Sequence, residues 1–445
     1  LWSPRFGFNY DLSEDRTTQI RGGGGLFAGL PPAVWLSNAY SNTGVDFARV
    51  DVATFRGQTV PAASADPNNQ PNIQGDVPTS DIVLLDKDFK LPQVFRTNLA
   101  IDRQLPHGLI GTLEVLYSKN ISEVFFRNLN QGDPNNPGAP TGTNVHDGRP
   151  DYGGDRVSRD FNSVILLDNT SEGHQLFFTA RLQKQLNRGP LPGLFGSLAY
   201  TFGESEDINS GRSSRAISNW QFNETNDPNG EKASTSDFEV RHRIVGDLSY
   251  HFSYGRGLGT TISLFYEGRS GNGFSYMYDN NANGDQSFGD NDLVFVPASR
   301  SDVSDQVSDE EWAKIETFIN SSDALQDARG KIFPRNSARE PWQNRLDLRI
   351  AQKIPSLRGQ NFELTLDVRN VLNLLNNDWG KVQFVRFNAD NFLDIRGGYD
   401  AQGKPIVTLD PRDSNGDGVI TQEDSFSTAD FSSRWQMQLG IRYSF

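Results

Sequence analysis

Two acidic, glycine-containing segments have the residue types and the spacing of a calcium-binding loop. The first spans residues 413–424 (DSNGDGVITQED), with Gly418 at position 6. Its oxygen-bearing residues fall at positions 1, 3, 5, 7, 9 and 12 of an EF-hand-type loop: Asp413, Asn415, Asp417, Val419, Thr421 and Asp424. Hard oxygen ligands at this spacing suit Ca²⁺, with the backbone carbonyl serving at position 7. Position 12 departs from the pattern because an EF-hand carries glutamate there, and no flanking helices are evident. We therefore expect a Ca²⁺-binding loop rather than a complete EF-hand, and the alternative is a plain acidic loop rich in turns.

The second segment, residues 279–290 (DNNANGDQSFGD), repeats this spacing with Gly284 at position 6. Its candidate ligands at positions 1, 3, 5, 9 and 12 are Asp279, Asn281, Asn283, Ser287 and Asp290. Because this set has fewer carboxylates, we expect it to bind Ca²⁺ more weakly than the first.

Other kinds of chemistry find little support. The chain has 0 cysteines, which excludes disulfides, thiol catalysis and thiolate metal sites. The glycine run at 21–25 (RGGGG) lacks the GK[ST] of a phosphate loop, and its glycines are better explained by a strand that bends or is closely approached. The 5 histidines form no HExxH motif, and no Ser/His/Asp arrangement stands out, so we expect no enzyme activity. The net charge of -14 argues against a nucleic-acid partner, which would require a basic face.

The elements that would carry the acidic loops are strands. In the last residues of the chain, RWQMQLGIRYSF, apolar side chains alternate with polar ones from Trp435 to Phe445. A period of two places these two sets on opposite faces of a strand. A soluble sheet with one solvated face shows the same alternation, but the final aromatic residue favours a membrane-spanning strand.

Five hairpins precede this last strand, each with a short turn rich in Gly, Pro, Asn or charged residues. The predicted strand pairs are 5–12 with 17–28, 94–104 with 109–119, 174–186 with 194–202, 240–252 with 259–268, and 345–354 with 362–370. The connections between hairpins are long and polar, at about 29–88, 128–170, 204–236, 270–340 and 372–431. Short turns at one end and long loops at the other are typical of a transmembrane antiparallel β-barrel with extracellular loops. The fold expected is therefore all-β, with about eleven strands in this chain.

The strands at 345–350 and 362–369 indicate which face meets lipid. Leu346, Leu348, Leu364 and Leu366 lie on the apolar face, whereas the opposite face carries charges of both signs. An Arg or Lys facing lipid at the midplane costs roughly 2–4 kcal/mol, so we expect the charged face to line the lumen. The chain has no run approaching the ~20 apolar residues of a spanning helix. One helix is expected in the loops, with Ser308 and Glu311 as a capping box and an apolar stripe of Trp312, Ile315 and Ile319.

Several segments together resemble one family. SPRFGFNYDL, RGGGGLFAGLPPAVWLSNAYSNTG, DFKLPQVFRTNLAIDRQLPHGLIGTLEVLYSKN, RHRIV, PWQNRLDLRIAQKIP and FELTLDVRNVLNLLNNDWG resemble the C-terminal half of TonB-dependent outer-membrane receptors. The group they resemble most is the Oar-like receptors, which have a carboxypeptidase-regulatory-like domain. The resemblance implies a barrel of about 22 strands closed by an N-terminal plug. Residues 1–445 would then form the C-terminal half, so we expect the plug, the segment that contacts TonB and the other strands to precede it.

The resemblance also implies partners and a function. We expect the protein in the outer membrane of a Gram-negative bacterium, in contact with lipid, with the TonB complex through the plug, and with the barrel-assembly machinery through Phe445. The expected function is energy-coupled import of an extracellular ligand whose identity the sequence does not give. The alternative is a surface-anchored barrel whose loops bind or help to export a protein partner. A simple porin fits the apparent half-barrel and the long loops less well.

Overall fold

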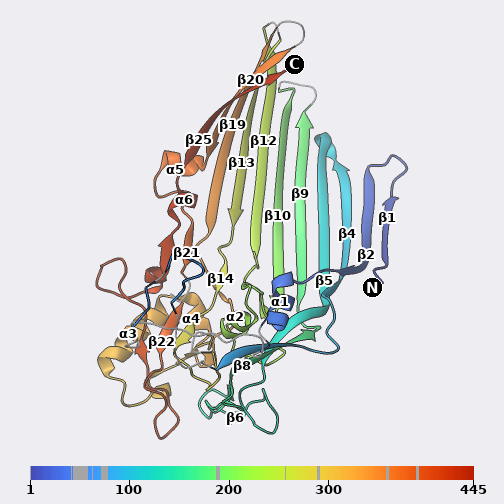
Figure 1. The fold of residues 1–445 in the computed structure, drawn as a ribbon. Coiled ribbons are helices and arrows are strands. Elements are labelled where there is room, and N and C mark those ends of the chain that lie inside the picture. Colours follow the sequence, from blue (N-terminus) through green and yellow to red (C-terminus); the bar gives the residue numbers. More distant parts are fainter. Residues whose placement is uncertain are drawn as a thin grey trace.

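The main element of the protein is one long antiparallel sheet. A computed structural model describes residues 2–41, 43, 59–62, 64–71, 79–186, 191–255, 257–287, 291–356, 360–386 and 390–445. Eleven strands follow one another across this sheet: β1 (Arg5–Asp11), β2 (Thr18–Ala28), β4 (Gln93–Leu105), β5 (Leu109–Asn128), β9 (His174–Leu186), β10 (Leu194–Asp207), β12 (His242–Tyr254), β13 (Leu258–Arg269), β19 (Gln343–Pro355), β20 (Asn361–Arg369) and β25 (Gln436–Ser444). The five predicted hairpins and the final strand are thus confirmed (Figure 1).

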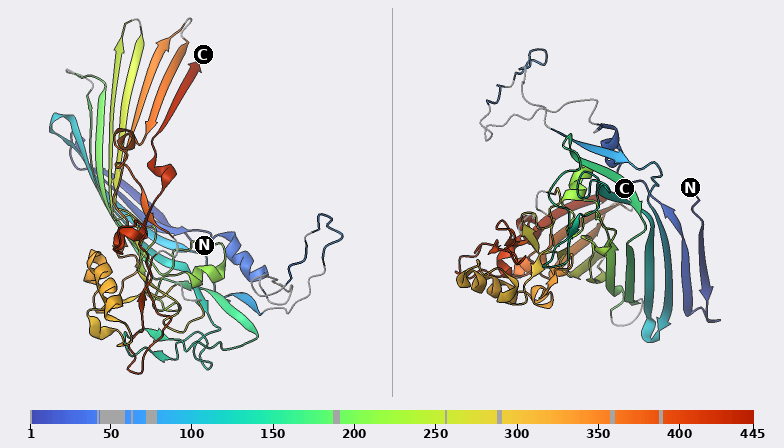
Figure 2. Two further views of the ribbon diagram at one scale, coloured as in Figure 1. Left: turned by 90° about the vertical axis from the view of Figure 1, so that its left-hand side faces the viewer. Right: turned by 90° about the horizontal axis from the view of Figure 1, so that it is seen from below.

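The sheet is curved but not closed within the described residues (Figure 2). In the described part of the chain, β1 pairs with β2 alone and β25 with β20 alone, so each has one open edge. The predicted turns at 13–16 and 106–108 are present, and His107 and Gly108 take positive φ values of 64° and 73°. The turns at 187–190 and 357–359, and Arg256 in the turn at 255–257, lie outside the described residues.

The register separates an apolar face from a polar one across the whole sheet. Leu264, Leu348, Val368 and Met437 form one continuous cross-strand row, and Ile262, Ile350, Leu366 and Leu439 form the next. The residues between them, including Ser263, Arg349 and Asp367, point to the other face. That face carries ion pairs between strands, such as Arg21 with Asp102 at 2.9 Å and Arg349 with Asp367 at 3.2 Å. The predicted split between the leucines and the charged residues is therefore present.

Glycines in β2 allow neighbouring strands to approach closely. A Cβ on Gly22 would lie 2.8 Å from the carbonyl oxygen of Asn98 in β4, and one on Gly23 would lie 2.6 Å from that of Phe6 in β1. The run Arg21–Gly25 is thus a strand whose glycines serve backbone packing on both sides, as expected.

The long connections contain more regular structure than the one predicted helix. Six helices are found in the described residues: α1 (Ala33–Ser41), α2 (Ala216–Gln221), α3 (Asp309–Asn320), α4 (Asp323–Asp327), α5 (Val371–Leu375) and α6 (Asp430–Ser433). The further strands are β3 (Ser80–Leu85), β6 (Gly142–Thr143), β7 (Pro150–Asp151), β8 (Phe161–Thr170), β11 (Ser234–Thr235), β14 (Gly273–Phe274), β15 (Met277–Asp279), β16 (Phe295–Val296), β17 (Lys331–Ile332), β18 (Ala338–Arg339), β21 (Gln383–Val385), β22 (Asn391–Asp394), β23 (Thr408–Leu409) and β24 (Phe426–Thr428). Among the described residues, no helix is both long and apolar enough to cross a membrane.

The predicted helix is α3, and its N-terminus is capped as expected by one side chain. Ser308 Oγ accepts a hydrogen bond from the N–H of Glu311 at 3.1 Å. The reciprocal half of the predicted capping box is replaced, because the Glu311 carboxylate accepts from the N–H of Leu409 at 2.7 Å. Ile315 and Ile319 are fully buried, so the apolar stripe packs inwards.

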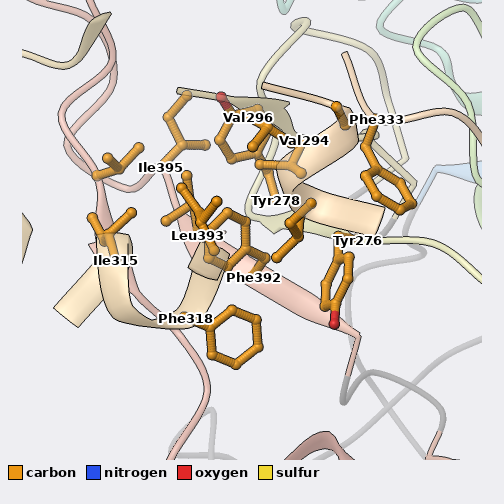
Figure 3. Close-up of a cluster of buried hydrophobic side chains, with 14 of the residues drawn as sticks. Tyr276, Tyr278, Val294, Val296, Ile315, Phe318, Phe333, Phe392, Leu393 and Ile395 are labelled. Carbon is orange, nitrogen blue, oxygen red and sulfur yellow. The ribbon is translucent and has the colours of Figure 1, made fainter. Parts of the chain in front are cut away.

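Most of these elements gather at the end of the sheet opposite the short turns, where two hydrophobic cores form (Figure 1). The larger core combines connections 270–340 and 372–431 around Tyr276, Phe318, Phe333 and Phe392 (Figure 3). Phe318 stacks on Phe392 with ring centroids 5.2 Å apart, and β15 pairs in parallel with β22. The smaller core joins α1 and α2 to β3, β8 and the outer part of β5. We call the described parts of connections 128–170, 204–236, 270–340 and 372–431 the loop platform.

Candidate functional site

The first acidic loop is wound around its own carboxylates. Asp413 at position 1 accepts from the N–H groups of Gly416 at 2.6 Å and Gly418 at 2.9 Å. Asn415 Oδ1 accepts from Asp417 at 2.9 Å, and Asp417 Oδ1 accepts from Val419 at 2.8 Å. Gly418 has a φ of +87°, as the turn at position 6 requires. The side-chain oxygens of positions 1, 3 and 5 are therefore drawn into one tight turn.

Asp424 closes this loop from position 12. Its carboxylate accepts from the N–H groups of Ser414 at 2.9 Å, Asn415 at 3.2 Å and Thr421 at 2.9 Å. Burial raises the pKa of Asp424, but these N–H groups outweigh burial and hold the pKa below its usual value, so the carboxylate stays charged. Each ionised carboxylate oxygen retains further lone pairs that could coordinate a cation. The donor set thus fits a hard cation in its chemistry, although the described residues contain no preassembled group of three or more His, Cys, Asp or Glu side chains able to hold a metal.

The second acidic loop is organised differently. Asp279 at position 1 forms an ion pair with Arg396 at 3.5 Å, and Asp290 at position 12 lies outside the described residues. Asn281 Oδ1 accepts from the N–H groups of Asn283 and Gly284, and Ser287 Oγ donates to Asn291. The central carboxylate belongs instead to Asp285, which is 3% exposed and accepts from the N–H of Ser287 at 2.7 Å. Asp285 lies at position 7, where the pattern expects a backbone carbonyl.

A buried ion cluster, not recognised in the sequence, joins two connections of the loop platform. Arg149 is 0% exposed and contacts Asp147 at 2.7 Å and Asp292 at 3.2 Å. It also donates to the carbonyl of Leu293 and lies over the ring of Tyr278. Burial raises the pKa of Asp292 to about 7, although Arg149 acts in the opposite direction. One guanidinium faces two carboxylates, so the cluster has an excess negative charge when both are ionised.

Other polar contacts complete the platform. The hydroxyl of Tyr152 donates to Asp227 at 2.6 Å, which links connections 128–170 and 204–236. Arg335 binds Asp207 at 3.0 Å and Asp237 at 3.2 Å, which links connections 204–236 and 270–340 at the end of β10. The connections that the sequence presents as separate polar loops are thus interlocked.

A hollow lies on the charged face of the sheet, at the platform end of β13, β19, β20 and β25. We call it the arginine hollow; its volume is about 310 Å³. Its charged lining residues are Arg269, Arg345, Arg369, Arg434 and Glu267. The sequence shows alternating charges on these strands, but which charges converge depends on the register of four strands and was not foreseen.

A comparison with known families identifies a barrel domain in this chain. Residues 1–386 match the family described as "Outer membrane beta barrel domain". The outer membrane transporter YddB from Escherichia coli is similar with a TM-score of 0.47 and 8% identity, over 99% of this chain and 40% of that chain. A mutant of the ferric enterobactin receptor PfeA from Pseudomonas aeruginosa is similar with a TM-score of 0.42 and 11% identity, over 100% of this chain and 40% of that chain. The chain therefore spans about two fifths of the length of these structures, and no curated protein matches it.

Proposed function

Because the chain belongs to the outer membrane beta barrel domain family, whose members lie in the Gram-negative outer membrane, we propose that it is part of a TonB-dependent receptor of the Oar-like group. The receptor imports a ligand across the outer membrane. The observation that carries this proposal is a sheet with one charged face, at one end of which the long connections interlock into the folded loop platform. A wide, open porin needs no folded platform at the end of its barrel, whereas a receptor needs a structure that captures its ligand.

The open edges of β1 and β25 support a larger barrel. Unpaired backbone groups in lipid cost several kcal/mol each, so a spanning sheet must close on itself. We propose that further strands complete a barrel of about 22 strands and that a plug fills its lumen. The plug would pack against the charged face and would carry the contact with the TonB complex.

The C-terminal strand supplies the proposed contact with the barrel-assembly machinery. Phe445 is 98% exposed, and its ring lies beside that of Tyr443 with centroids 5.8 Å apart. Deleting Phe445, or replacing both aromatic residues with Ser, should block insertion and leave degraded precursor. Surface abundance of these variants is the measurement, and a normal amount would remove this contact from the proposal.

We also propose that Ca²⁺ orders the loop at 413–424 and binds more weakly to the loop at 279–290. In the first loop the ion would be held by Asp413, Asn415, Asp417, the Val419 carbonyl, Thr421 and Asp424. Its chemistry would be structural, since it would neutralise three carboxylates gathered around Gly418.

The competing function is a surface anchor that binds or helps to export a protein partner. The large core of the loop platform favours this alternative because a folded extracellular surface also suits protein binding. Energy dependence separates the two functions, since import through a TonB-coupled receptor requires energy and simple anchoring does not.

The test compares the solutes left in the growth medium by three strains of the producing bacterium. These are the wild type, a strain lacking the gene and a strain lacking TonB. Mass spectrometry of the spent medium should find a solute that only the wild type depletes. Identical media from all three strains, under conditions in which the protein is abundant at the surface, would reject import and leave the anchor.

A further inference from the structure

We propose that the arginine hollow binds an anionic group of the imported solute, a carboxylate or a phosphate. The inference rests on the proposed import function for the identity of the solute but on local geometry for its charge. The hollow lies on the charged face of the sheet, where Arg269 ends β13 and Arg369 ends β20. A solute that enters the lumen past the loop platform would therefore meet the arginine hollow at the platform end of the barrel wall.

The single acidic residue that lines the hollow does not neutralise its four arginines. Glu267, its one acidic lining residue, is already bound by Arg243, which contacts Oε1 at 2.6 Å. Arg345 is engaged by both carboxylate oxygens of Asp347, and Arg434 is paired with Asp430 at 3.0 Å. Two of the four guanidinium groups thus have carboxylate partners of their own.

The other two guanidinium groups remain available. Arg269 donates two hydrogen bonds, at 3.0 and 2.9 Å, and both go to the neutral side-chain oxygen of Gln343. The guanidinium of Arg369 forms no hydrogen bond or ion pair with any residue that the structure describes, and the residue is exposed. Its charge acts on Asp347, but the oxygens of that carboxylate already accept from Arg345 and from the N–H of Asn370. The charge of Arg269 acts on Glu340, whose carboxylate oxygens accept from the N–H groups of Asn272 and Val385. Among the described residues, neither guanidinium thus has a carboxylate as a hydrogen-bond partner.

This arrangement selects ligands by charge and geometry. Guanidinium groups bind carboxylate and phosphate oxygens through paired, charge-assisted hydrogen bonds. The net charge of the whole chain is -14, so a local excess of positive charge is the exception on this molecule and would focus anions at the barrel wall. Phe431, from α6, is 81% exposed and also lines the hollow, where its ring offers an apolar surface to the uncharged part of a ligand.

The test uses the complete protein in detergent and the fluorescent aryl trisulfonate pyranine as the probe. Fluorescence anisotropy should show saturable binding that pyrophosphate and citrate compete away and that salt weakens. In the double variant Arg269→Gln with Arg369→Gln, the Kd should rise about tenfold or more, because two charge-assisted contacts are lost. The change of native electrophoretic mobility on heating confirms that each variant is folded.

A matched control removes the same charge elsewhere on the same face. Lys353→Gln with Arg442→Gln lies near the short-turn end of β19 and β25 and should leave binding unchanged. The inference is overturned if the wild type shows no saturable binding of pyranine. An acidic segment of the plug that filled the hollow would give this result. An equal loss in both double variants overturns the inference as well. Binding in detergent needs no energy source, so a positive result stands even if import is disproved, and a negative result leaves import open.

Discussion

Arg149 shows how a single residue can decide whether the loop platform holds together. Its guanidinium lies between Asp147 and Asp292 with 0% of its side chain exposed. Breaking a buried ion pair on one side leaves an uncompensated charge, which costs about 3–5 kcal/mol. The same cluster contains one carboxylate more than it can neutralise, and this asymmetry makes the three residues unequal under mutation.

We expect Arg149→Met to open the junction between connections 128–170 and 270–340, because it leaves two buried carboxylates without a positive partner. Asp292→Asn should cost much less, since burial already raises the pKa of Asp292 to about 7 and the amide resembles its protonated form. Hydrogen exchange of residues 277–287 and 291–296 measures the opening.

The stability of this junction should fall as the pH rises. The pKa of Asp292 is higher in the fold than its usual value of 3.8, so the folded junction binds the proton more tightly than the unfolded one. Protection from exchange should therefore be greater at pH 6 than at pH 8, and Asp292→Asn should remove this difference. Equal damage from Arg149→Met and Asp292→Asn would contradict this account of the cluster.

The acidic loop at 413–424 gives the second prediction at this scale. Asp413→Ala with Asp417→Ala should make residues 411–425 sensitive to protease, and Ca²⁺ should no longer protect them. Glu423→Ala, in the same loop but outside the ligand pattern, should keep the protection. If millimolar Ca²⁺ fails to protect even the wild-type loop, the segment is an acidic turn and binds no ion.

What the sequence reveals at this scale depends on distance along the chain. The first acidic loop could be predicted because its residues lie within one twelve-residue segment, and the structure winds them into one turn. Arg149 and Asp292 are 143 positions apart, and neither stands in a motif. Arg269 and Arg369 lie on strands separated by β19, so their meeting depends on register.

At the scale of elements, the membrane strands were predictable and the platform was not. Strict alternation marks β19, β20 and β25 because each strand has one face in lipid, and a short connection joins β19 to β20. β3 and β8 form a parallel pair from connections far apart in sequence, and β15 pairs with β22 in the same way. No local pattern specifies such pairing. The single predicted helix, α3, carries its own cap and apolar stripe, whereas the other helices in the described residues have nine residues or fewer.

Two adjacent positions on β20 test the assignment of its faces. Leu366→Arg should destabilise the barrel by roughly 2–4 kcal/mol, the cost of Arg facing lipid at the midplane. Thr365→Arg introduces the same side chain on the charged face, opposite Ala351, and should cost far less. Urea unfolding in lipid vesicles measures both values. A similar loss of stability at the two positions would mean that the faces are wrongly assigned.

At the scale of the whole molecule, the chain consists of a sheet and a folded platform at one end of it. The eleven-stranded sheet has one apolar and one charged face, and the loop platform lies at the end opposite the short turns (Figure 1). The arginine hollow lies where the two meet, between strand ends and α6.

The most direct measurement of this arrangement is the water accessibility of single cysteines in β19. The chain has 0 cysteines of its own, so each introduced thiol is labelled without background. In isolated outer membranes, a small water-soluble thiol reagent should react with Asp347→Cys and Arg349→Cys and should spare Leu346→Cys, Leu348→Cys and Ile350→Cys. Labelling of all five positions, or labelling of the former leucines and isoleucine alone, would contradict a barrel wall with its charged face in the lumen.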